Sequence, residues 1–228
     1  LVAKELGRLE RPGKFFNFTV DRPKMQIVDG ERVITKPNTI VHHAKDESSG
    51  RDYLFLHIRE PHANGEDYVD AIVALLKHFG VTEYCRIGSM YDQVPHSRPL
   101  IVTGNVPDSL VEKARGLVTK RKRPYQGPTS IMTLVGESLE GTEIQSTSLM
   151  VHIPHYTQLS ADHLGTSRLL EVLGAIYGFP SSLSDPSKGE QQYSEINEAV
   201  ANSPEARRYV KKLEADYEEA QEPEEEKE

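Results

Sequence analysis

The chain has 228 residues, of which 37% are hydrophobic and 27% are charged, enough for one globular domain with a full core and an appendage. Its formal net charge of −8 disfavours nucleic acid and anionic membrane surfaces as partners, and no apolar run approaches the ~18 residues of a membrane-spanning helix. The single cysteine, Cys85, cannot form an intramolecular disulfide, so we expect a reducing, cytoplasmic location.

The first half of the chain predicts mainly strands. Residues 1–9 are typical of the end of a helix that closes near Gly7, so we expect native residues upstream of this chain. The Asp29-Gly30 pair lies between two stretches of alternating polarity and predicts a β-hairpin over residues 26–35. Two strands are then expected at residues 39–43 and 53–58, the second covered on both faces, and a helix at residues 68–79.

The second half alternates strands with helices. Strands are expected at residues 82–88, 100–103 and 147–153, and helices at residues 107–117, 129–139 and 161–178. This alternation predicts an α/β fold with a mostly parallel sheet flanked by helices, to which the hairpin adds an antiparallel element. After a turn-rich connector, two helices with narrow apolar faces follow, and Ser203-Pro204 predicts a serine N-cap before a proline at the start of the second. We therefore expect an α/β core domain at residues 1–180 and a C-terminal helical appendage with a disordered acidic tail at residues 181–228.

Three stretches combine glycine or proline with hydrogen-bonding side chains beside apolar runs, and we expect them to converge at one edge of the sheet. In the first, Pro95 and Pro99 force their neighbours into extended conformations. This stiff stretch, which we call the proline segment, holds the side chains of His96, Ser97 and Arg98. The Arg98 guanidinium could bind a carboxylate or an anion, or equally bridge two backbone segments.

The strand after the proline segment ends in Thr103-Gly104, where a ligand could approach the backbone closely or the chain could simply turn. The last of the three stretches contains His152, His155 and Tyr156, with a proline between the two histidines. We expect this proline to bend the chain off the sheet, and to aim His155 and Tyr156 into a cleft or pack them locally. Two histidines and one cysteine do not supply the ligands of a structural zinc site, so no metal is expected.

The middle stretch contains Tyr125, Gly127, Thr129 and Ser130 directly before a predicted helix. Free amides at such a helix start bind anions readily, yet the lysine of a Walker loop is absent, and capping of the helix by Thr129 or Ser130 is the simpler explanation. The basic run at residues 120–123 is expected to be a solvated surface loop, and no contact with nucleic acid is expected.

No catalytic constellation is evident in the sequence. The chain has no Gly-x-Ser-x-Gly nucleophile motif, and a Ser89–His96 couple would lack an acid at any expected spacing. Cys85 lies within a predicted strand and is expected to be an inert core thiol. We therefore expect no catalytic residue and no cofactor, and the residues favour a protein that is not an enzyme.

The residues of these stretches, and the order of the stretches along the chain, resemble those of a known family. Val94 to Pro99, Val102 to Gly104, Tyr125 to Thr129 and Val151 to Tyr156, together with Arg22-Pro23, are similar to the proteasome assembly chaperone family. The resemblance is to its bacterial and archaeal branch, which is similar to proteasome assembly chaperone 2, and it covers about residues 15–180. The opening strand and loop of that family are absent, so the chain is expected to be N-terminally incomplete.

The resemblance implies an α/β sandwich with a topology similar to that of nucleoside phosphorylases. It also implies self-association into a homo-oligomer, a trimer or larger among the possibilities, and assistance in the assembly of proteasome α subunits. Members that dock on proteasomes can end in a hydrophobic residue, a tyrosine and one further residue, whereas this chain ends in Glu226-Lys227-Glu228. Docking through the last residues is therefore not expected.

Two main hypotheses of different classes remain, beside a third in which His96, His152 and His155 would serve a metal-dependent hydrolase. The first is a non-catalytic, self-associating assembly or interaction protein with a protein partner and with neither a nucleic acid nor a membrane partner. The alternative is a small-molecule binding protein or enzyme, for nucleosides or carboxylates, with a nucleoside-phosphorylase-like fold. Its site would use the side chains of Arg98, Thr103, Tyr125, Thr129 and His155.

Overall fold

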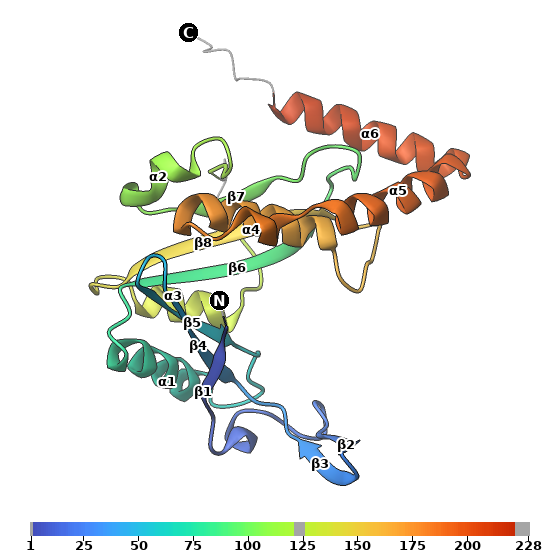
Figure 1. Cartoon of the computed structure of the whole chain (residues 1–228). Helices are drawn as coiled ribbons and strands as arrows, with labels where there is room; N and C mark the ends of the chain where they lie inside the picture. The colour runs from blue at the N-terminus through green and yellow to red at the C-terminus, as the bar shows by residue number, and fades with distance from the viewer. Residues whose placement is uncertain (1, 121–125, 222–228) are drawn as a thin grey trace. The chain divides into compact units, whose positions relative to one another are not determined.

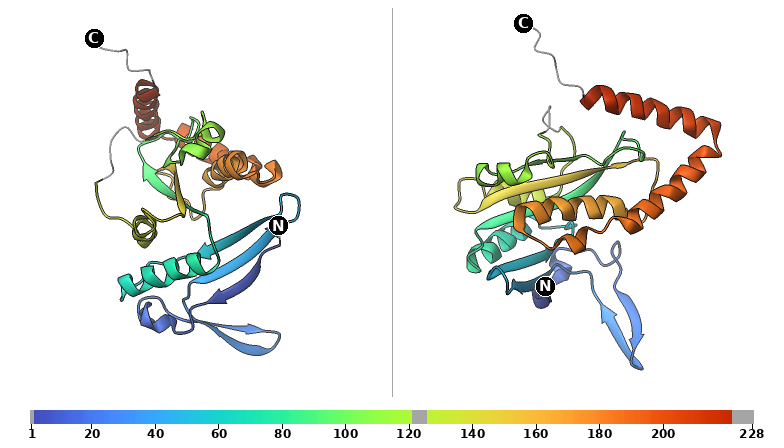
Figure 2. Two further views of the ribbon diagram at one scale, coloured as in Figure 1. Left: turned by 90° about the vertical axis from the view of Figure 1, so that its left-hand side faces the viewer. Right: turned by 45° about the horizontal axis from the view of Figure 1, so that its top comes forward.

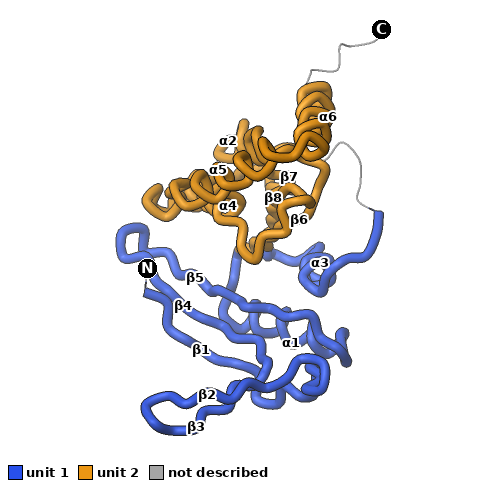
Figure 3. Tube along the Cα trace, turned by 90° about the vertical axis from the view of Figure 1, so that its right-hand side faces the viewer, with its two compact units in different colours: residues 1–82, 126–144 blue, residues 83–125, 145–228 orange. Residues whose placement is uncertain are grey.

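The computed structural model describes residues 2–120 and 126–221. The chain forms two compact units, each built from two stretches of sequence (Figure 3). Unit 1 comprises residues 1–82 and 126–144, and unit 2 comprises residues 83–125 and 145–228. The predicted division at residue 180 stays a prediction.

Unit 1 contains a three-stranded antiparallel sheet in the order β1-β4-β5, formed by Lys4–Arg8, Ile40–Asp46 and Arg51–His57. The helix predicted at residues 1–9 is wrong, because residues 4–8 pair along β4, with Lys4 opposite His43 and Arg8 opposite Ile40. A short helical segment is marginal by itself, and pairing with an existing strand outweighs its weak helical tendency.

The predicted mostly parallel sheet is not confirmed by these strands. β4 and β5 are joined by residues 47–50, with Gly50 at a φ of 68°. A parallel connection needs a crossover of roughly a dozen residues or more, so this short turn requires an antiparallel pair. β5 is also not covered on both faces, since its Phe55 side chain is 37% exposed.

The predicted hairpin is confirmed as β2 (Lys24–Val28) and β3 (Glu31–Thr35). Asp29 and Gly30 have φ values of 52° and 82°, and two consecutive positive φ angles are what a type I′ turn requires. The hairpin forms a separate two-stranded sheet and extends away from the β1-β4-β5 sheet of the same unit (Figures 1 and 2).

Two predicted helices of unit 1 are confirmed as α1 (Gly65–His78) and α3 (Ile131–Ser138), and a short 3-10 helix spans Pro12–Lys14. Tyr68 of α1 is fully buried in the core of this unit. Its ring packs edge-on against Phe15 and Phe16, with centroids 5.2 and 6.0 Å away, and its hydroxyl hydrogen-bonds to Thr39. Aromatic burial of this kind contributes much of the stability of a small core.

Unit 2 contains a three-stranded sheet in the order β6-β8-β7, formed by Glu83–Asp92, Gln145–Pro154 and Val102–Asn105. β6 and β8 are parallel along their whole length, and β7 is antiparallel to β8. Among the named strand pairs of residues 2–120 and 126–221, β6–β8 is the only parallel one. The fold is therefore α/β with mixed and antiparallel sheets.

The helices of unit 2 are α2 (Asp108–Ala114), α4 (His163–Tyr177), α5 (Ser187–Ala201) and α6 (Pro204–Gln221), with a 3-10 helix at Ser181–Ser184. Val172 and Ile176 of α4 share one hydrophobic core with Val151 of β8, so α4 covers one face of this sheet. α5 approaches α4 closely at Gly189, where a Cβ atom would lie 2.5 Å from the Leu164 backbone.

α5 and α6 are the two C-terminal helices expected from the sequence. Ser203 caps α6 as predicted, because its Oγ accepts a hydrogen bond from the Ala206 amide at 3.3 Å. α6 folds back from the end of α5 (Figures 1 and 2). Within the described part of the chain, no helix has both the length and the apolar character to cross a membrane.

Candidate functional site

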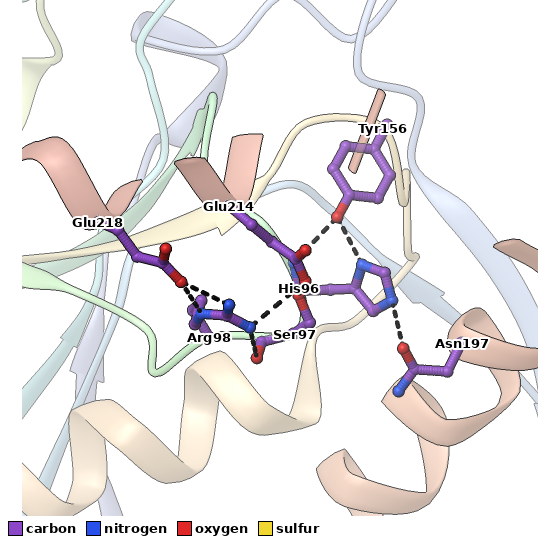
Figure 4. A network of polar contacts seen from close by, with 7 residues as sticks. All are labelled: His96, Ser97, Arg98, Tyr156, Asn197, Glu214 and Glu218. Atoms are coloured by element: carbon purple, nitrogen blue, oxygen red, sulfur yellow. Dashed lines mark hydrogen bonds and ion pairs between the residues drawn. The ribbon is translucent and has the colours of Figure 1, made fainter. Parts of the chain in front are cut away.

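The proline segment connects β6 to β7 in unit 2 and contacts helix α6 (Figure 4). Arg98 reaches two glutamates of that helix. Its Nη2 lies 2.6 Å from Oε1 of Glu218, and its Nη1 lies 3.3 Å from Oε1 of Glu214. Glu214 is 25% exposed and Glu218 is 61% exposed, so solvent screens the Arg98–Glu218 pair more strongly than the Arg98–Glu214 pair. The carboxylates that Arg98 binds therefore come from the same chain.

Two neighbouring groups of the proline segment contact the same face of α6. Ser97 Oγ donates a hydrogen bond to Oε1 of Glu214, and the Tyr217 hydroxyl donates to the Pro99 carbonyl at 2.9 Å. Residues 214, 217 and 218 are three and four positions apart, a spacing that places their side chains on one side of a helix. One face of α6 therefore contacts the Ser97 hydroxyl, the Arg98 guanidinium and the Pro99 carbonyl of the proline segment.

His96 is 4% exposed and is bonded within unit 2. Its Nδ1 lies 2.5 Å from the Tyr156 hydroxyl, and its Nε2 lies 2.9 Å from Oδ1 of Asn197 in α5 (Figure 4). Burial lowers the pKa of His96 below its ordinary value of 6.5, which favours a neutral ring. We assign the tautomer in which Nε2 donates to Asn197 and Nδ1 accepts from Tyr156. Both ring nitrogens are then satisfied inside the protein.

His155 brings the last of the three stretches to the same helix. Its Nε2 lies 3.1 Å from the Tyr209 hydroxyl of α6, and its Nδ1 lies 3.1 Å from the Asp92 carbonyl oxygen. The rings of His155 and Tyr156 pack edge-on against Tyr209, with centroids 5.9 and 6.0 Å away. We call Ser97, Arg98, the Pro99 carbonyl and His155 the α6-binding surface.

A second polar cluster joins all three strands of the unit 2 sheet. His152 Nδ1 lies 2.6 Å from Oδ2 of Asp92, and His152 Nε2 lies 2.8 Å from Oγ1 of Thr103. Hydroxyl, imidazole and carboxylate are in the order of a nucleophilic triad. However, Thr103 is only 7% exposed and lies within β7, whereas a nucleophile must reach its substrate. The arrangement ties β6, β7 and β8 together.

Gly104 allows the backbones of β7 and β8 to approach closely and does not form a turn. A Cβ atom at this position would lie 2.0 Å from the carbonyl oxygen of Ser148 in β8. The space beside Gly104 is therefore filled by the neighbouring strand.

Residues 126–130 of the middle stretch belong to unit 1, where Gly127 and Thr129 are exposed, and Tyr125 lies outside the described residues. Thr129 Oγ1 donates to the Thr133 hydroxyl at 2.8 Å. The first amide of α3, that of Ile131, donates to the Glu60 carboxylate at 2.9 Å. Neither expected side chain caps this helix, and Ser130, at the N-cap position, makes no side-chain capping bond. A carboxylate distant in sequence occupies the anion-binding helix start.

Two grooves are bordered by residues other than the predicted site residues. The groove of unit 1 has a volume of about 250 Å³ and is bordered by apolar side chains, among them Leu6, Leu75 and Phe79. The groove of unit 2 has a volume of about 510 Å³ and is bordered by residues that include Ile87 and Tyr91. None of the site residues predicted from the sequence lines either groove.

The partners of the predicted residues were not found from the sequence. Asp92 was missed because the strand before it was expected to end at residue 88, whereas β6 continues to residue 92. Glu214 and Glu218 carry a signal in their four-residue spacing on one helix face, but a charged helix face is usually solvated. Among residues 2–120 and 126–221, no group of three His, Cys, Asp or Glu side chains could hold a metal ion.

Solved structures with the same fold come from bacteria and archaea. A protein of unknown function from Corynebacterium glutamicum is 21% identical with a TM-score of 0.82, over 95% of this chain and 80% of that one. A proteasome-assembly chaperone homologue from Mycobacterium tuberculosis, Rv2125, is 24% identical with a TM-score of 0.76, over 91% and 87%. The proteasome activator PbaB of Pyrococcus furiosus is 15% identical with a TM-score of 0.65, over 88% and 82%.

These likenesses show that the fold is shared. No significant match was found among curated proteins. The resemblance recognised from the motif stretches is confirmed, because the family model for the PAC2 family matches residues 1–201. The chain therefore belongs to the PAC2 family.

Proposed function

We propose that this chain is a non-catalytic, self-associating protein that assists the assembly of a protein complex. The observation that carries the proposal is the β2–β3 hairpin. In its register Met25 pairs with Ile34 and Ile27 pairs with Arg32, so three large apolar side chains share one face. These three side chains are 60%, 60% and 67% exposed, respectively.

An isolated two-stranded hairpin is marginally stable in water. Exposing a cluster of apolar side chains on such an element marks it as an interaction surface. We infer that the hairpin packs against the same hairpin of a second copy, because an isologous contact joins identical apolar faces and closes the assembly. This agrees with the self-association that the family resemblance implies.

The polar residues of the motif stretches support a non-catalytic role. The side chains of His96, Arg98 and His155 make hydrogen bonds to groups of their own unit, and a reacting group has to be available to its substrate. Solved structures that share the fold include a proteasome-assembly chaperone homologue and a proteasome activator. We therefore propose unassembled proteasome α subunits as the first partner to examine.

One observation favours the alternative of a small-molecule enzyme. The hydrogen-bonded chain Asp92–His152–Thr103 contains the groups that activate a hydroxyl nucleophile. A thermal-shift panel of nucleosides, nucleotides, phosphate and carboxylates examines it. Stabilisation by one ligand in the wild type and its loss in Thr103→Val would favour the enzyme, and no response across the panel would count against it.

Sedimentation velocity over a range of concentrations tests the hairpin contact. We expect wild type to self-associate and the double variant Ile27→Ser, Ile34→Ser to be a monomer with an unchanged melting temperature, since the hairpin lies away from the core. The matched control Lys24→Ser, Gln26→Ser alters the opposite hairpin face and should associate like wild type. A wild type that stays monomeric, or a control as weak as the apolar variant, would contradict the proposal.

The assembly role is tested by mixing the chain with unassembled proteasome α subunits and following ring formation by size-exclusion chromatography. We expect faster ring formation with wild type than with the apolar hairpin variant. Equal rates with and without the chain would refute the assembly role and leave the self-association result standing.

A further inference from the structure

The apolar face of the β2–β3 hairpin contains a methionine. Met25 of β2 is 60% exposed and lies opposite Ile34 of β3, and Ile27 follows on the same face of the hairpin. The other three methionines of the chain are half-buried, at positions 90, 132 and 150. A reagent in solution therefore reaches the thioether of Met25 more readily than the thioethers of the other three.

Hydrogen peroxide oxidises an accessible thioether directly. The sulfur atom attacks one oxygen of the peroxide, and an S–O bond forms as the O–O bond breaks. The second oxygen leaves as hydroxide, which takes the proton of the first oxygen and becomes water. The sulfur is oxidised to a sulfoxide and the peroxide is reduced, so a flexible apolar side chain becomes a polar one. Methionine sulfoxide reductases reverse the change, with a dithiol as the reductant and with water and a disulfide as products.

We propose that Met25 is a redox-sensitive modification site, at which oxidation by hydrogen peroxide weakens the association of two copies through their hairpins. The inference rests on the proposed hairpin contact and states how that contact is regulated. In an isologous contact the same residue lies on both sides, so the assembled pair buries Met25 of each copy. Oxidation therefore introduces two sulfoxide oxygens into an apolar interface, where a polar group without a hydrogen-bond partner is unfavourable.

Oxidation of Met25 leaves the core of unit 1 intact. The hairpin is a separate two-stranded sheet, and the core of the unit is formed by other side chains, among them Phe16 and Tyr68. In a free copy the sulfoxide remains hydrated, so its unfavourable effect falls on association and not on folding. The reverse effect follows by linkage: association protects Met25 from peroxide, because only free copies expose the thioether.

Oxidation and association are measured on the same samples of the full chain. After treatment with excess hydrogen peroxide, peptide mass spectrometry gives the oxidised fraction of Met25, and sedimentation velocity gives the dissociation constant. We expect oxidised wild type to associate about tenfold more weakly, since burial of a methionine side chain contributes at least about this factor. Methionine sulfoxide reductase should restore association. The matched control Met25→Leu keeps an apolar side chain of similar size that peroxide does not oxidise, so it should associate equally before and after treatment.

The rate of oxidation gives a second readout. Met25 of wild type should be oxidised more slowly as the protein concentration rises, whereas in the variant Ile27→Ser, Ile34→Ser the rate should not depend on concentration. Unchanged association after complete oxidation of Met25, or a Met25→Leu variant that peroxide dissociates to the same extent, would refute the redox regulation and leave the hairpin contact standing. An untreated wild type that stays monomeric would refute the hairpin contact itself, and the regulation with it.

Discussion

Replacing Gly104 with alanine is expected to destabilise unit 2 severely. The new Cβ atom would lie 2.0 Å from the carbonyl oxygen of Ser148, which is backbone and has no rotamer to change. Ordinary contacts of carbon are about 3.5 Å, so β7 and β8 must separate by more than about 1 Å. The hydrogen bonds on both sides of the glycine would then be strained or lost.

The magnitude follows from these two effects. Overpacking a well-packed site costs about 1–3 kcal/mol, and each weakened hydrogen bond costs about 1 kcal/mol. We expect a loss of about 3–5 kcal/mol in the free energy of unfolding. The matched control is Gly88→Ala, whose Cβ would meet the flexible end of Met150 at 3.3 Å. A shift of that side chain is cheap, so the control should change stability by less than about 1 kcal/mol.

Urea unfolding followed by far-UV circular dichroism measures both variants, since the chain has no tryptophan for fluorescence. With a slope of about 1–3 kcal/mol per molar urea, the midpoint for Gly104→Ala should fall by about 1–5 M. A Gly104→Ala variant as stable as Gly88→Ala would refute the reasoning. It would instead favour a Gly104 that leaves room for a ligand, since alanine would then disturb no strand contact.

Three further predictions concern the packing of unit 2. Burial lowers the pKa of His96 below 6.5, so on acidification the unfolded chain takes up this proton at a higher pH than the folded chain does. Stability should therefore fall as pH drops from about 7 to about 5, and His96→Gln should flatten this pH dependence in urea titrations at several pH values. His152→Ala removes the imidazole that joins the three strands and should cost about 2–4 kcal/mol, measured by urea unfolding, whereas a near-neutral result would mean that the cluster does not tie the sheet. Gly189→Ala places a Cβ 2.5 Å from the Leu164 backbone and should lower the melting temperature of unit 2 in a calorimetric scan, while Lys188→Ala, with an exposed side chain, should not.

Short-range signals were sufficient for much of the secondary structure. The turn at Asp29-Gly30 was predicted because few residues tolerate two positive φ angles in succession. Helix α4 was predicted from apolar spacing, and Ser203 was predicted as the cap of α6 before a proline. The motif stretches also sufficed to identify the family, because their residues and their order are properties of the sequence itself.

Pairing of strands needed long-range information. Residues 4–8 form a strand only because β4 offers unpaired backbone groups beside them, which no local pattern reports. The direction of β5 followed from a four-residue connection rather than from its apolar content. The Glu60 carboxylate at the start of α3 comes from a position 71 residues earlier in the chain.

Local sequence likewise identified the motif residues, whereas the tertiary structure determined which groups they bind. Sequence alone indicated that Arg98, His155 and their neighbours would be bonded to something, because polar side chains held on stiff segments need partners. Folding selected those partners: α6 lies more than 100 residues after the proline segment and places its glutamates within reach of Arg98. Local conformational preferences act over a few residues, whereas the identity of a hydrogen-bond partner depends on which distant segments the core brings together.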